Sequence, residues 1–105
     1  MKTKTDKKAK RGTLCLPART VREMAVELRR EVEALIRQGM QEIVFDLTEA
    51  TLVDSAVLGA LIHVRRDYPV DQVAMVLYAP HGYVREIIEN AGLASLFIVK
   101  SSKEA

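Results

Sequence analysis

The residues best suited to chemistry in this sequence are an Asp-Ser pair, Asp54 and Ser55. Residues 43–47 before the pair are apolar, β-branched and aromatic without alternation, which predicts a strand covered on both faces. Residues 56–66 after it have the apolar spacing of a helix. Ser55 is therefore expected at the join, where its hydroxyl can cap the helix or carry a phosphoryl group. The free N–H groups and the dipole of a helix start favour such an anion.

Two acidic residues near this join, Asp46 and Asp54, offer an enzymatic interpretation. Asp54 could activate Ser55 as a nucleophile or bind Mg²⁺. A serine nucleophile also needs a base and an oxyanion site, and the sequence identifies neither. There is no glycine-rich phosphate loop, His63 and His81 lack a metal-ligand pattern, and the single cysteine excludes a cysteine cluster. We therefore expect no catalytic residue, no cofactor and no metal.

Length and charge predict one soluble domain with a basic start. A chain of 105 residues is large enough for a single core. Residues 1–11 hold six Lys or Arg against Asp6, a net charge of +5, which leaves −3 of the total of +2 for the rest. No apolar stretch approaches the ~20 residues that span a bilayer, so a cytoplasmic protein is expected. We expect 1–11 to be a disordered tail, 12–100 to be the domain, and 101–105 to be a polar end.

The order of elements predicts an α/β domain. A capping box from Thr20 to Glu23 opens a long amphipathic helix that Gly39 ends. Residues 79–82 form a turn into a third helix, which Gly92 closes in a left-handed conformation. Strands that alternate with helices predict a central, mostly parallel sheet of four to five strands with about three main helices packed on it. Further strands are expected near residues 13–16, 72–78 and 96–99.

Two pairs of motifs connect this chain to a known family. FDLT at residues 45–48 is followed by LVDSAVLG at residues 52–59, and VREII at residues 84–88 is followed by AGL at residues 91–93. These motifs resemble the signature of STAS domains, the fold of bacterial anti-sigma factor antagonists. In that family a strand ending in Asp-Leu-Ser or Asp-Leu-Thr leads to Asp-Ser-Ser-Gly-Leu-Gly or a close variant. The resemblance covers roughly residues 13–99.

The resemblance implies a regulator that works by partner switching. Unphosphorylated, such a protein binds an anti-sigma factor that is also a serine kinase, and so releases the sigma factor. Phosphorylation by that kinase breaks the complex, and a phosphatase restores it. The partner supplies ATP and Mg²⁺, so this chain is a substrate and not an enzyme. By motif position, Ser55 is the phosphoacceptor. The docking surface implied by the motif contains Asp54, Ala56, Val57, Leu58 and Gly59.

Two positions depart from the family motif. Ala56 replaces the second Ser or Thr, and Val57 replaces the first Gly. We expect the branched side chain of Val57 to meet a partner shaped for glycine. The usual first strand is expected to be short or missing, because lysine-rich residues stand in its place.

Two other functions stay open. The chain could be a non-switching STAS subunit of an ABC-type lipid transporter or of a sensory assembly, with the basic residues 1–11 touching anionic lipid. It could also be a small enzyme or nucleic-acid binder that uses Asp46, Asp54 and the same basic residues. We expect no specific nucleic-acid partner, no membrane span, and a monomer or weak dimer.

Overall fold

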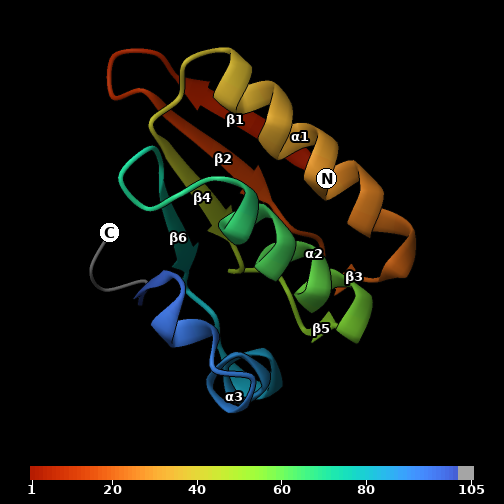
Figure 1. Cartoon of the computed structure of the whole chain (residues 1–105). Coiled ribbons are helices and arrows are strands. Elements are labelled where there is room, and N and C mark those ends of the chain that lie inside the picture. Colours follow the sequence, from red (N-terminus) through yellow and green to blue (C-terminus); the bar gives the residue numbers. More distant parts are fainter. Residues whose placement is uncertain (102–105) are drawn as a thin grey trace.

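A five-stranded, mostly parallel sheet forms one layer of the molecule, and helices form the other (Figure 1). The computed structural model describes residues 1–101, so the polar end expected at 101–105 lies outside the described residues except for Ser101. The strand order is β1-β2-β4-β6-β7, and only β1 runs antiparallel to its neighbour. The strands are β1 (Lys2–Asp6), β2 (Arg11–Cys15), β4 (Glu42–Asp46), β6 (Ala74–Tyr78) and β7 (Ile98–Lys100).

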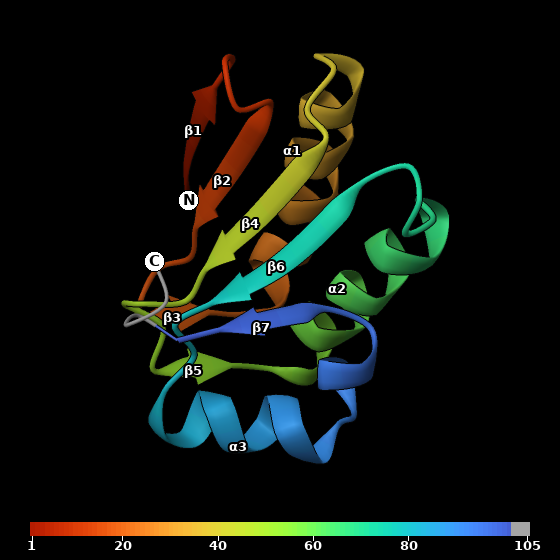
Figure 2. The same cartoon turned by 90° about the vertical axis from the view of Figure 1, so that its left-hand side faces the viewer.

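A separate pair of very short parallel strands lies beyond the ends of the main sheet. These are β3 (Arg19–Thr20) and β5 (Leu52–Val53), with Arg19 opposite Leu52 and Thr20 opposite Val53. The pair links two loops that leave the carboxyl ends of β2 and β4 (Figure 2). The predicted α/β fold is therefore confirmed, with this two-stranded addition.

Helices cover one face of the main sheet and leave the other open. Figure 2 shows α1 (Ala25–Arg37) and α2 (Ser55–Asp67) on the same side of the sheet, with α3 (Gly82–Asn90) below β5 and β7. Two short 3₁₀ helices complete the chain: η1 (Arg22–Met24) leads into α1, and η2 (Leu93–Ser95) precedes β7. Gly92 has φ +74°, the left-handed conformation expected after the third helix.

The central strand β4 is buried on only one face. Ile43 and Phe45 are fully buried against the helices, whereas Val44 between them points to the open face and is half-buried. Successive side chains of a strand point to opposite faces, so a helix layer on one side buries only alternate residues. The prediction that this strand is covered on both faces is wrong.

The core lies between the sheet and its two long helices. Phe45 contacts Phe97 edge to face, with ring centroids 6.0 Å apart. Gly12 of β2 lets α1 approach closely, because a Cβ there would lie 2.7 Å from a methyl group of Leu35. Most of the largest fully buried side chains come from β2, β4 and β6 and from α1 and α2; they include Leu14, Leu28, Leu35, Ile43, Leu61, Met75 and Leu77.

The basic residues at the start form an edge strand. β1 pairs along its whole length with β2, from Lys2 opposite Cys15 to Asp6 opposite Arg11. Thr3 donates a hydrogen bond to Glu31 of α1 at 3.1 Å, so the strand is held from its helix side as well. The prediction of a disordered tail at 1–11 is therefore wrong, and the domain begins before residue 12. Its exposed residues lack an apolar pattern because charged residues protect a free sheet edge from further pairing.

Candidate functional site

Ser55 is the first residue of α2 and is exposed. The residue before it, Asp54, occupies the N-cap position in an extended conformation, and its Oδ1 accepts a hydrogen bond from the amide of Val57 at 3.0 Å. The capping role considered for Ser55 therefore belongs to Asp54. Within residues 1–101, no hydrogen bond engages the Ser55 hydroxyl. The hydroxyl is thus accessible and is not needed to hold the helix.

The second oxygen of Asp54 holds a distant part of the chain. Oδ2 accepts a hydrogen bond from the backbone amide of Arg22 at 2.7 Å, so one carboxylate joins the start of α2 to η1. The predicted capping box from Thr20 to Glu23 is wrong. The Thr20 hydroxyl donates to the carbonyl of Pro17 at 2.9 Å, and neither η1 nor α1 has a side-chain cap of its own. The true donor and acceptor are 32 residues apart, a separation that no local motif reveals.

The first turns of α2 present some of the predicted docking residues and bury another. Ala56, Leu58 and Gly59 are half-buried. A Cβ added at Gly59 would meet nothing within 4 Å, so open space lies in front of this backbone. Val57, in contrast, is 0% exposed and belongs to the core. Its helical position turns it towards the sheet, so the expected conflict between its side chain and a partner does not arise, and we exclude it from the docking surface.

A hydrogen-bonded loop supports the site from the side of α3. The Nε2 atom of His81 lies 2.9 Å from the carbonyl oxygen of Thr48. The amide of Thr48 in turn donates to Asp46 Oδ1 at 2.9 Å, so both backbone polar groups of Thr48 have a partner. His81 precedes α3 directly. This histidine has a structural contact, and His63 is exposed on α2.

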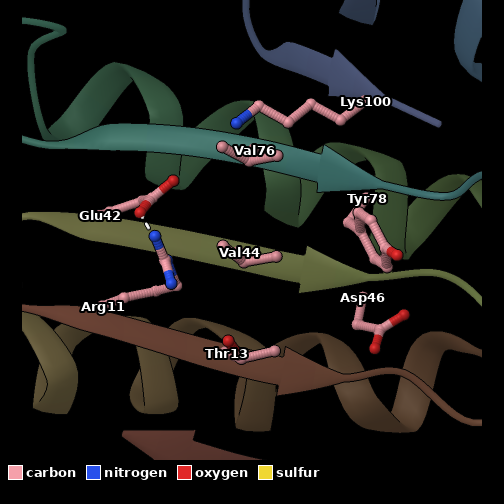
Figure 3. A pocket seen from close by; sticks show the side chains of 8 residues that line it. All are labelled: Arg11, Thr13, Glu42, Val44, Asp46, Val76, Tyr78 and Lys100. Atoms are coloured by element: carbon pink, nitrogen blue, oxygen red, sulfur yellow. Dashed lines mark hydrogen bonds and ion pairs between the residues drawn. The ribbon is translucent and has the colours of Figure 1, made fainter. Parts of the chain in front are cut away.

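The open face of the sheet carries a shallow cavity of about 430 Å³. Figure 3 shows the ion pair of Arg11 and Glu42 at one end of it, and Asp46 at the other end beside Tyr78. The hydrogen bond from the Arg11 Nε to Glu42 is 2.6 Å long and raises the pKa of Arg11. The remaining lining residues are Thr13, Val44, Val76 and Lys100.

Asp46 and Asp54 do not form one reaction centre. Asp46 lines the open-face cavity and bonds Thr48, whereas both oxygens of Asp54 accept backbone amides on the helix side. In the part of the chain that the structure describes, no group of three or more His, Cys, Asp or Glu side chains has the arrangement of a metal site. The geometry gives no support to an Asp46–Asp54 catalytic pair.

The sequence and the fold agree on the class of protein. The family model described as STAS domain matches residues 21–105. "Putative anti-sigma factor antagonist BtrV" of Bordetella bronchiseptica is 32% identical over 81 residues, which cover 77% of this chain and 70% of that protein. The chain belongs to the STAS-domain family, and this relative places it with the anti-sigma factor antagonists of that family.

Solved structures show the same fold at low sequence identity. The Thermotoga maritima protein TM1081 has a TM-score of 0.82 and 17% identity, over 98% of this chain and 82% of that chain. The Bacillus cell fate determinant SpoIIAA in its phosphorylated form has a TM-score of 0.73 and 15% identity, over 98% and 93% of the two chains. None of the helices within residues 1–101 combines the length and the apolar composition that a membrane span requires.

Proposed function

We propose that this protein is a cytoplasmic anti-sigma factor antagonist that works by partner switching at Ser55. In the unphosphorylated form it binds an anti-sigma factor that is also a serine kinase. That partner transfers the γ-phosphoryl group of its ATP to the Ser55 oxygen. The P–O bond to ADP breaks, a new P–O bond forms at Ser55, and the hydroxyl proton is released. A phosphatase later removes the phosphoryl group by hydrolysis.

The observation that carries this proposal is that Asp54 caps α2, whereas the Ser55 hydroxyl is exposed and makes no bond within residues 1–101. Asp54 caps α2, so modification of Ser55 does not remove the cap. The Ser55 hydroxyl is exposed at a helix start, where free N–H groups favour an anion. The cap and the modified hydroxyl therefore belong to different residues.

The docking surface that we propose consists of Asp54, Ser55, Ala56, Leu58 and Gly59. The open space in front of Gly59 gives a partner's backbone room to approach. A phosphoryl group at Ser55 adds about −1.5 to −2 charges. Placed inside a packed interface beside Asp54, that charge costs desolvation and repels the carboxylate, so the complex dissociates.

The test is an intact-mass spectrum of the protein purified from its own host under several growth conditions. We expect a species heavier by about 80 Da, one phosphoryl group in place of a proton, that is absent in the matched Ser55→Ala protein. A second measurement compares the affinity of the wild type and of Ser55→Asp for the anti-sigma factor, with weaker binding expected for Ser55→Asp. No mass change together with equal affinities would favour a non-switching STAS subunit instead.

A further inference from the structure

The segment that contains β3 and η1 forms one border of the surface around Ser55. The amides of Thr51 and Leu52 both donate to the carbonyl of Ala18 at 2.9 Å, and the amide of Asp54 donates to the carbonyl of Thr20 at 3.3 Å. The parallel pairing of β3 with β5 continues this contact. Residues 18–22 are therefore fixed beside the Asp-Ser pair although they precede it by about 30 positions.

Arg22 is a cationic residue whose backbone this arrangement brings into contact with the pair. Its backbone amide lies 2.7 Å from Asp54 Oδ2, and Asp54 is bonded covalently to Ser55. Its side chain is exposed, and within residues 1–101 no hydrogen bond or ion pair engages its guanidinium group. The guanidinium therefore has no protein partner to give up when it binds an anion.

We propose that Arg22 binds the phosphoryl group of phosphorylated Ser55. This assignment rests on the proposed function, because it concerns the modified form of that site. A guanidinium presents two parallel N–H donors that match phosphate oxygens. In the free phosphorylated protein, the ion pair offsets the repulsion between the phosphate and Asp54. It also neutralises a positive charge at the border of the docking surface, so phosphorylation changes both Ser55 and the neighbouring border.

The chain provides a matched control for this assignment in Arg19. Arg19 is also exposed and lies in the same segment, but its backbone faces Leu52 and not Asp54. Two carboxylates also belong to this region: Glu23, which follows Arg22 in η1, and Asp54 itself. Substitution of Arg22 keeps its backbone amide, so the hydrogen bond to Asp54 survives. A change in the ionisation of the phosphate is then caused by loss of the guanidinium and not by a change in the fold.

The experiment uses the full chain with phosphoserine incorporated at position 55 during translation, so that no kinase is needed. The second ionisation of the phosphate is followed by ³¹P NMR as a function of pH. We expect its midpoint in Arg22→Gln to move to higher pH than in the wild type, because loss of a nearby cation disfavours the dianion. Arg22→Lys should stay close to the wild type, and Arg19→Gln should move less than Arg22→Gln.

An unchanged midpoint in Arg22→Gln would overturn the assignment, and so would an equal displacement in Arg19→Gln, which would indicate a diffuse effect of charge. Urea unfolding of each variant shows that the fold is retained. These outcomes are separate from those of the proposed function. Absence of phosphorylation in the host would contradict the switch and leave the NMR result valid, whereas a phosphorylated host protein with an unchanged midpoint would contradict only the role of Arg22.

Discussion

The two ends of α2 use the same device in opposite environments. At the start, the half-buried carboxylate of Asp54 accepts two backbone amides, beside an exposed serine. At the end, the guanidinium of Arg65 donates to the carbonyls of Tyr68 and Val73, at 2.6 and 3.2 Å. Arg65 is only 6% exposed, and burial lowers its pKa. Each charged side chain thus holds a neighbouring loop to an end of the helix.

The difference in burial separates the functions of these ends. Breaking a buried hydrogen bond to a charged group costs much free energy, because no water can replace the lost partner of the group left behind. The hydrogen bonds of Arg65 are therefore structural and stay formed in the folded domain. Around Asp54 and Ser55, solvent can replace a lost bond, so this end tolerates a new charge without unfolding the domain. A regulatory modification therefore fits the Ser55 end of α2 and not the Arg65 end.

Removal of the Arg65 guanidinium should have the largest effect on stability. We expect Arg65→Ala to lower the free energy of unfolding by about 2 to 4 kcal/mol, since it leaves two carbonyls without their charged donor and removes buried packing. Urea unfolding measures the cost. The matched control is Arg66→Ala, an exposed neighbour without a hydrogen bond or ion pair in residues 1–101, with an expected change within about 0.5 kcal/mol. Equal costs for the two variants would contradict the structural role of the Arg65 hydrogen bonds.

Removal of the Asp54 carboxylate should have an intermediate effect on stability. Asp54→Ala loses the cap of α2 and the bond to Arg22, and we expect a cost of about 1 to 2 kcal/mol. The control is Asp67→Ala at the opposite end of α2, where the helix dipole disfavours a negative charge and the substitution should be neutral or slightly stabilising. A cost for Asp54→Ala as large as that for Arg65→Ala would contradict the contrast between the ends.

The smallest effect should be a gain in stability with a loss of binding. Gly59→Ala places a methyl group in open space inside a helix, so we expect stabilisation by up to about 1 kcal/mol. The same methyl group should weaken binding of the anti-sigma factor if its backbone approaches there. His63→Ala, an exposed position one turn further along α2, serves as the control and should leave the affinity unchanged. Unchanged affinity in Gly59→Ala would remove Gly59 from the docking surface.

The sequence by itself determined the fold class, the family and the position of Ser55 at the start of a helix. These features depend on local patterns: the apolar run of residues 43–47, the helical spacing after Ala56, and the order of motifs along the chain. Gly92 illustrates the same point, because its left-handed conformation follows from its own place after a helix. Such signals need only neighbouring residues.

Only the tertiary structure decided which groups meet. Residues 2–6 have no apolar pattern, and they form a strand because β2 offers them a free edge. Val57 occupies a position where the family motif has glycine, and the packing of α2 on the sheet buries it. The carboxylate of Asp54 finds the amide of Arg22 across 32 residues because β3 pairs with β5. Long-range pairing and burial depend on how the elements pack, so no pattern of neighbouring residues contains them.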